Sequence, residues 1–196
     1  MEPIILASAS ARRQQLLTQI GVHFIVRGQD IDETIRDAEL PHDYVVRMAM
    51  EKANSALDEI TVNQENAHSI VLAADTSVVC DADVLGKPGN EADALSMLQR
   101  LSNREHRVLS AVTLASQYKQ RTILCESRVN FRKITLDEAR QYYRSGEPQG
   151  KAGAYAIQGF AAVFVRRLTG SYSGVMGLPL FETAQLLAEF GVPVTL

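Results

Sequence analysis

The first residues with chemical potential follow the first apolar run of the chain. Ser8-Ala9-Ser10-Ala11-Arg12-Arg13 places two hydroxyls and two guanidinium groups at the expected start of a helix. A helix N-terminus presents unpaired backbone N–H groups and the positive end of the helix dipole, so it suits a phosphate. The side chains add donors of the same kind. The segment therefore indicates a phosphate site, although a capped surface helix with two solvated arginines explains the same residues.

Three ionisable side chains further along the chain have positions that favour a cleft. Lys52 lies in a helical stripe of apolar residues, where a lysine is rare unless it is paired or reaches solvent. Asp75 follows an apolar run, and α/β proteins commonly keep ligand and metal groups at the carboxyl ends of buried strands. Glu33, in an acidic segment, offers a second hard oxygen ligand. A turn aspartate and a solvated acidic loop remain open as plainer interpretations.

Two glycine-containing segments complete the candidates. Gly86-Lys87-Pro88 places a lysine in a turn but lacks the spaced glycines and the hydroxyl of a Walker sequence. Residues 151–159 are rich in small side chains, which let a ligand approach the backbone, and Gln158 offers a donor and an acceptor to a base edge. A packed loop crossing a sheet is the alternative. The sequence has no serine-nucleophile elbow, no dinucleotide-binding glycine pattern and no His/Cys metal cluster.

The elements expected around these residues alternate between strands and helices. Apolar runs predict strands at residues 3–7, 24–26, 70–74, 77–80 and 160–167, and a hairpin from residues 108–115 and 122–131. Capping and periodicity predict helices at residues 11–20, 41–57, 135–146 and 180–190, and another after Asn90. This alternation favours a mixed α/β sheet.

Composition limits the class of protein. The 196 residues, 46% hydrophobic and 22% charged, predict one globular domain over residues 1–196, elaborated into two lobes. The net charge of −3 argues against nucleic acid as a partner, which usually needs a basic surplus. Without a signal sequence or a run of about 18 apolar residues, we expect a cytoplasmic protein with no membrane partner. Cys80 and Cys125 lack metal-ligand spacing and are expected to be reduced core residues.

Together, the segments resemble the Maf family of nucleotide pyrophosphatases over essentially the whole chain. The matching segments, in the family's order and approximate spacing, are Ser8-x-Ser10-x-Arg12-Arg13, Glu33, Glu51-Lys52-Ala53, Ala74-Asp75-Thr76, Gly86-Lys87-Pro88, Lys151-Ala152-Gly153 and Gly177-Leu178-Pro179. Tyr155-Ala156-Ile157-Gln158-Gly159, with the arginine pair and Thr76, resembles the subgroup that acts on dTTP and UTP. Ala11 and Gly174 depart from a usual proline and a common asparagine, so Gly174 is left out of the predicted site.

The resemblance implies a fold and a reaction. The fold is a mixed, twisted α/β sheet with flanking helices and two lobes around a deep cleft, similar to inosine triphosphate pyrophosphatases. The reaction converts dTTP, UTP and modified pyrimidine nucleotides to the monophosphate and pyrophosphate, with a divalent cation, Mg²⁺ or Mn²⁺. A homodimer is expected by analogy alone.

Within this resemblance each candidate residue receives a role. The predicted catalytic residues are Asp75, Lys52, Lys87 and Glu33, of which Asp75 and Glu33 bind the metal. Asp75 takes a proton from the attacking water, and the lysines stabilise charge on the phosphate oxygens. The phosphate chain contacts Ser8, Ser10 and Arg13, and the base contacts Arg12, Thr76 and Gln158.

Two other functions stay open at this point. A nucleotide-binding regulator of septum formation, with secondary or no hydrolysis, would use the same cleft. An enzyme that acts on 7-methylated guanosine triphosphate is disfavoured by Gln158 and Arg13.

Overall fold

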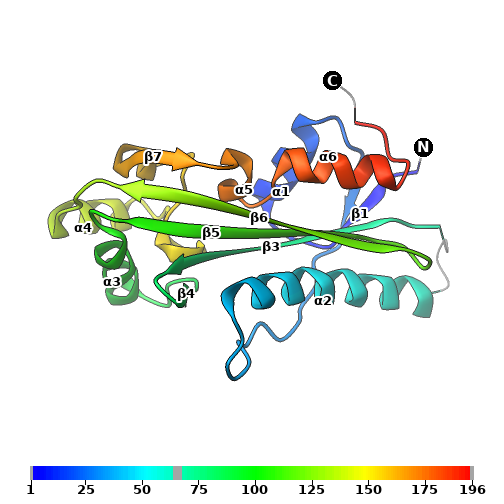
Figure 1. The fold of residues 1–196 in the computed structure, drawn as a ribbon, viewed down its shortest axis with the longest axis horizontal. Helices are drawn as coiled ribbons and strands as arrows, with labels where there is room; N and C mark the ends of the chain where they lie inside the picture. The colour runs from blue at the N-terminus through cyan, green and yellow to red at the C-terminus, as the bar shows by residue number, and fades with distance from the viewer. Residues whose placement is uncertain (1, 64–67, 195–196) are drawn as a thin grey trace.

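The computed structural model describes residues 2–63 and 68–194, and a mixed sheet runs through this part of the chain (Figure 1). Its strands are β1 (Ile4–Leu6), β2 (Phe24–Val26), β3 (Val71–Cys80), β4 (Asp83–Leu85), β5 (Glu105–Ala115), β6 (Gln120–Phe131) and β7 (Val165–Thr169). The order across the sheet is β2-β1-β3-β5-β6-β7, with β4 paired to β3. β1 pairs in parallel with β2 and β3, and the remaining pairs are antiparallel. The predicted mixed α/β sheet with flanking helices is therefore confirmed.

Helices cover both faces of this sheet. They are α1 (Ala11–Gln19), α2 (Pro41–Val62), α3 (Glu91–Leu101), α4 (Leu136–Arg144), α5 (Tyr172–Met176) and α6 (Leu180–Glu189), with short 3-10 helices η1 (Ala152–Ala154) and η2 (Phe160–Phe164). α2 lies along one face, while α1, α5 and α6 lie on the other (Figure 1). The apolar stripe of α2, which includes Val45, Met48 and Ala49, is fully buried against the sheet, so Lys52 on the same stripe is carried inside the molecule.

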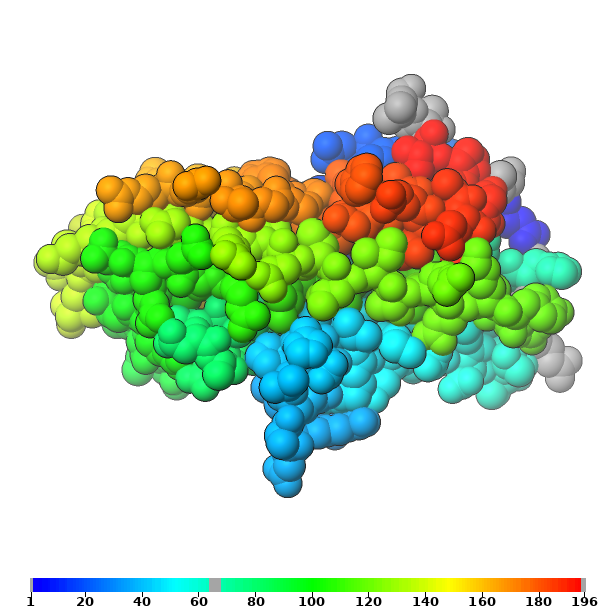
Figure 2. Space-filling model, in the orientation of Figure 1, coloured from blue at the N-terminus to red at the C-terminus, as the bar shows by residue number. Residues whose placement is uncertain are grey.

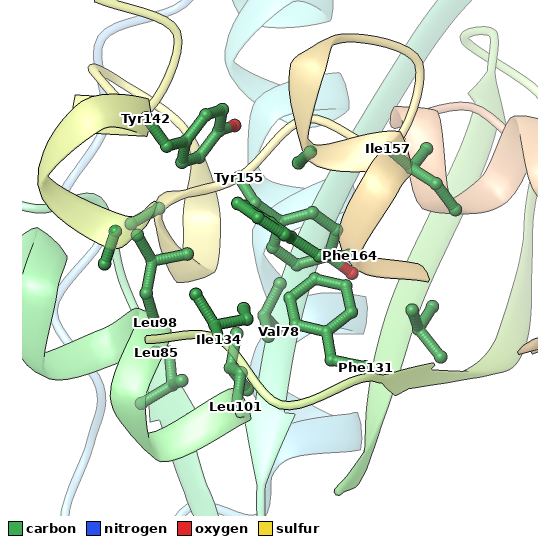
Figure 3. Close-up of a cluster of buried hydrophobic side chains, with 14 of the residues drawn as sticks. Val78, Leu85, Leu98, Leu101, Phe131, Ile134, Tyr142, Tyr155, Ile157 and Phe164 are labelled. Carbon is green, nitrogen blue, oxygen red and sulfur yellow. The ribbon is translucent and has the colours of Figure 1, made fainter. Parts of the chain in front are cut away.

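The far end of the sheet carries a separate aromatic core. Phe131 packs edge-to-face on Tyr155 with ring centroids 4.9 Å apart, and Tyr142 packs the same way on Phe164 at 5.4 Å. Figure 3 shows these rings meeting aliphatic side chains from α3 and β3. We call these buried residues the aromatic cluster. A second apolar core lies where α1 and α6 cover β1 and β3.

The structure differs from the predicted elements in several places. The strands expected at 70–74 and 77–80 form one strand, β3, because Asp75 and Thr76 stay in the ladder opposite Ala111 and Ser110 of β5. α2 continues past residue 57 to Val62, and the short strand β4 was not anticipated. Residues 160–164 form η2 instead of a strand, and β7 begins only at residue 165.

Other expectations can be compared with the described residues. Cys80 and Cys125 are buried free cysteines, as predicted. No helix in the described ranges is long and apolar enough to cross a membrane. The segment between β2 and α2, residues 27–40, has no helix or strand, and Figure 2 shows it projecting from the body of the molecule. We call it the acidic loop.

Candidate active site

A cleft of about 730 Å³ opens beside the central part of β3. Its lining comes from the start of α1, the acidic loop, α2, β3, the turn after β4, and residues 150–158. All ten side chains singled out in the sequence line this one cleft: Ser8, Ser10, Arg12, Arg13, Glu33, Lys52, Asp75, Thr76, Lys87 and Gln158. Segments more than 140 residues apart in the chain therefore contribute to one site.

A lysine and two carboxylates form a charged cluster in the cleft. Lys52 Nζ donates to Glu33 Oε1 at 2.6 Å and to Asp75 Oδ1 at 2.8 Å, and its side chain is only 10% exposed. Lys87 Nζ lies 3.4 Å from Glu33 Oε2 at the open side. Partial burial raises the pKa of Glu33, but the hydrogen bond and charge of Lys52, with a contribution from Lys87, hold that pKa below its ordinary value. The arrangement keeps Glu33 ionised at neutral pH.

The start of α1 supplies donors beside this cluster. Ser10 caps the helix by accepting from the backbone N–H of Arg13 at 3.4 Å, and Ser8 Oγ accepts from Arg13 Nη1 at 3.1 Å. Arg13 Nε also donates to the carbonyl of Gly177 at 2.9 Å. Burial lowers the pKa of Arg13, against the attraction of Asp75 and Glu33, but a guanidinium stays charged at neutral pH.

Thr76 is held by neighbours that the sequence did not single out. Its Oγ1 lies 3.1 Å from Ser110 Oγ, and the Ser110 hydroxyl also donates to the carbonyl of Gly174 at 2.6 Å. Arg13 Nη2 approaches Thr76 Oγ1 at 3.5 Å. The hydroxyl of Thr76 is therefore fixed between β5 and the segment around α5.

Two side chains meet across the mouth of the cleft. When the amide oxygen of Gln158 faces Arg12, it accepts from Arg12 Nε at 2.9 Å and from Nη2 at 2.8 Å. Arg12 also donates to Gln15 at 2.7 Å. This contact joins the start of α1 to residues 150–159, which we call the small-residue loop, and it presents an amide and a planar guanidinium to the cleft.

Sequence reasoning missed the residues that fix the acidic loop. The hydroxyl of Tyr44 donates to the backbone carbonyl of Glu33 at 3.0 Å, and burial together with Asp75 and Glu33 raises the pKa of this tyrosine to about 12. Arg47 donates to both carboxylate oxygens of Glu39, at 2.5 and 2.7 Å, and to the carbonyl of Thr34 at 3.0 Å. The sequence predicts that Tyr44 and Arg47 lie on a helix. It does not predict their partners, which lie in a loop without helix or strand.

The arrangement combines acceptors for a cation with donors for a polyanion. Within residues 2–63 and 68–194, no group of three or more Asp, Glu, His or Cys side chains converges as a metal site. Asp75 and Glu33 nevertheless converge on one ammonium group, that of Lys52. Such a pair of carboxylates suits an ion that takes its remaining ligands from phosphate oxygens and water.

Comparison with known proteins gives the same class of protein. A dTTP/UTP pyrophosphatase of Colwellia psychrerythraea is 47% identical over 97% of this chain and 89% of its own length. Proteins of the same name from Vibrio vulnificus and Alkalilimnicola ehrlichii are 47% and 49% identical, covering 97% and 96% of this chain and 100% and 93% of their own. One solved structure, a Vibrio cholerae protein with a TM-score of 0.42 and 10% identity over 98% of this chain and 99% of its own, is too distant to inform the argument.

The family model described as Maf-like protein matches residues 3–190, which is nearly the whole chain. Together with relatives that are almost half identical over most or all of their length, this match settles the family. The chain belongs to the Maf family.

Proposed function

We propose that this protein hydrolyses dTTP and UTP to the monophosphate and pyrophosphate. The observation that carries the proposal is the Glu33–Lys52–Asp75 cluster, which faces the serines and arginine at the start of α1 in one cleft. The names of the similar proteins, dTTP/UTP pyrophosphatase, support the same activity and substrates. The proposal places the protein in the cytoplasm with a nucleotide, and no nucleic acid, as its partner.

The triphosphate binds with its phosphate chain at the start of α1. Ser8, Ser10 and Arg13 supply donors there, and the backbone N–H groups of the first helical turn add the positive end of the dipole. Lys52 and Lys87 lie on the opposite side and stabilise charge as it develops on the phosphate oxygens. A chain with a net charge of −3 thereby presents a local surplus of cations to a polyanion.

Asp75 and Glu33 fit a divalent cation, Mg²⁺ or Mn²⁺, because they are hard oxygen donors that already contact one positive group from two sides. When bound, such an ion supplies charge neutralisation on the triphosphate and makes water a better nucleophile at neutral pH. Lys52 keeps the two carboxylates from repelling each other and holds both near the phosphates.

Water attacks the α-phosphorus, and its proton passes to the carboxylate of Asp75. The bond between the α-phosphorus and the bridging oxygen breaks as the new P–O bond forms, and pyrophosphate leaves with the electron pair. Asp75 suits this role because it lies inside β3, opposite Ala111 of β5, so the backbone holds it rigidly. Arg12, Thr76 and Gln158 contact the base from the mouth of the cleft.

The decisive experiment measures pyrophosphate release from a panel of triphosphates with and without Mg²⁺ or Mn²⁺. We expect metal-dependent release from dTTP and UTP, and a loss of about a thousandfold in Asp75→Asn with an unchanged thermal unfolding midpoint. Near-normal turnover in a folded Asp75→Asn would remove Asp75 from the mechanism. Nucleotide binding without turnover by the wild-type protein would favour a regulator instead. Sedimentation of the same sample tests the predicted homodimer.

A further inference from the structure

One carboxylate outside the site described above bonds to the backbone just after Gln158. Glu147, in the turn after α4, accepts from the backbone N–H of Phe160 through Oε2 at 2.9 Å. It accepts from the N–H of Ala161 through Oε1 at 3.2 Å. The same Oε1 accepts from the hydroxyl of Tyr142 at 2.7 Å. Glu147 therefore fixes the residues that follow Gln158.

Tyr142 extends this network to the residues that precede Gln158. Its hydroxyl oxygen accepts from the backbone N–H of Ala156 at 3.1 Å while donating to Glu147. Tyr142 is only 5% exposed and packs on Phe164 in the aromatic cluster, where Figure 3 shows it near Tyr155. Burial, and then the hydrogen bond to Glu147, raise the pKa of this tyrosine, so its hydroxyl remains a donor.

The backbone at Gly159 is shaped to accept this carboxylate. A Cβ built on Gly159 would lie 1.9 Å from Glu147 Oε2, so a side chain at this position excludes Glu147 from its present place. The φ of Gly159 is −105°, a value that alanine also adopts. Space for the carboxylate is therefore the physical reason for a glycine next to Gln158.

From these contacts we propose that Glu147 is a positioning residue that sets base discrimination by holding Gln158. The inference rests on the proposed function, in which Gln158 contacts the base. Neither Glu147 nor Tyr142 lines the cleft. They act through residues 156–161, whose two ends they hold against α4 and the turn that follows it, and Gln158 in this segment lines the cleft and contacts Arg12. Hydrogen bonds to a charged acceptor are about twice as strong as neutral ones, which suits a carboxylate to this task.

The test compares kcat and KM for dTTP, UTP and CTP between the wild type and Glu147→Gln. Glutamine keeps the shape of the side chain but places its NH₂ group against a backbone N–H or the hydroxyl of Tyr142. The small-residue loop should therefore shift from its position. We expect the ratio of kcat/KM for dTTP to that for CTP to fall about tenfold, a loss that a displaced amide contact accounts for. Asp137→Asn, on α4 with an 85% exposed side chain, is the matched control and should leave the ratio unchanged.

A double variant distinguishes a positioning role of Glu147 from a general effect of this residue on stability. If Glu147 acts through Gln158, then Glu147→Gln added to Gln158→Ala should change the base ratio by less than roughly twofold. Additive effects of the two substitutions would overturn the proposal, as would an equal loss of kcat/KM on every base in Glu147→Gln alone.

Two further variants cover a failure of Glu147→Gln to fold. Tyr142→Phe removes one hydroxyl, and Gly159→Ala displaces the intact carboxylate, so each should reproduce the shift in base ratio. An unchanged ratio in both would also contradict the proposal. A wild-type protein inactive on every triphosphate is a different result, because it rejects the proposed function itself, and the positioning role falls with it.

Discussion

Two loops bring side chains into the cleft, and different forces hold them in place. The acidic loop carries Glu33 and is anchored by charges, with Arg47 bound to Glu39 through two hydrogen bonds and to the carbonyl of Thr34. The small-residue loop carries Gln158 and is anchored by packing, since its residues 154–157 are buried beside the aromatic cluster. One loop is a surface projection tied down by ion pairs, and the other forms part of a core.

The difference follows from what each loop has to do. Opening the acidic loop would expose little apolar surface, so its position depends on a few polar contacts, and a highly charged substrate can shift it. Moving the small-residue loop would disrupt contacts between aromatic rings, which is costly in a close-packed core. Glu33, the proposed catalytic carboxylate, is therefore held in a position that can adjust. Gln158, which is proposed to contact the base, is held rigidly.

Substitution of Lys52 is expected to have the largest effect on the charged half of this comparison. Lys52→Met leaves Glu33 and Asp75 without the ammonium group between them, so the carboxylates repel each other and the acidic loop moves away. We expect kcat/KM for dTTP to fall about a thousandfold, because a buried charge partner and a transition-state contact are lost together.

Lys87→Met is the matched control for that substitution. Lys87 contacts the same Glu33 but is 63% exposed, so its ion pair is screened by solvent, and we expect a loss of about tenfold or less. Steady-state kinetics on the two variants provide the measurement. Equal losses in both variants would show that Lys52 acts only as one of several cations. The Glu33–Lys52–Asp75 cluster would then have no particular importance for the reaction.

We expect the aromatic cluster beside the small-residue loop to lose stability over a different pH range from the acidic loop. His106 is 3% exposed, contacts Tyr155 through Nε2 at 2.9 Å, and has no hydrogen-bond partner at Nδ1 among the described residues. Burial, with a smaller contribution from Arg104, lowers its pKa to about 4. The unfolded chain binds the proton first, so the free energy of unfolding should fall as pH drops from about 6.5 to 4, by about 3 kcal/mol.

Urea unfolding between pH 4 and 7 measures this loss, and His106→Gln should lack it. The acidic loop titrates lower, because the hydrogen bonds from Arg47 lower the pKa of Glu39 to about 2. Its contribution is present above about pH 4.5, the ordinary value, and is lost as pH falls toward 2. Identical pH profiles for the wild type and His106→Gln would mean that the buried histidine contributes nothing to acid sensitivity.

The sequence predicted the fold class and the residues around the cleft better than it predicted element boundaries. Residues 160–164 look like a strand because they are apolar, but Glu147 accepts the N–H groups of Phe160 and Ala161 and stabilises a 3-10 helix. Asp75 and Thr76 look like a break between strands because they are polar, but they continue the ladder of β3. In both places a tertiary partner decides the backbone, and local pattern cannot reveal it.

The same limit explains which contacts in the site escaped prediction. The carbonyls of Gly174 and Gly177 accept from Ser110 and Arg13, and backbone acceptors leave no mark on the sequence. From the sequence alone, Arg47 resembles an ordinary solvent-facing residue of a helix. Its contacts form only because the acidic loop packs over it. The side chains proposed to contact substrate could be singled out because their types carry chemistry, whereas the side chains that hold them could not.

A smaller effect than that of Lys52→Met is expected at the anchor of the acidic loop. Arg47→Lys keeps the charge but loses the paired hydrogen bonds to Glu39, because an ammonium cannot match a carboxylate as a guanidinium does. Glu33 should then spend less time beside Lys52, and kcat/KM for dTTP should fall about tenfold. Arg36→Lys is the control, since its side chain is 67% exposed and pairs with Glu51, and its contact with Glu39 comes from the backbone N–H, which the substitution keeps.

Salt separates the two means of anchoring. If charges hold the acidic loop, raising KCl from about 0.05 to 0.5 M should lower kcat/KM more steeply in Arg47→Lys than in the wild type, because one ammonium–carboxylate contact resists salt less well than the paired hydrogen bonds of a guanidinium. Tyr142→Phe, which loosens the small-residue loop, should follow the wild-type salt dependence, since a hydroxyl and aromatic packing hold that loop. Parallel salt curves for all three proteins would remove the distinction, because both loops would then depend on packing alone.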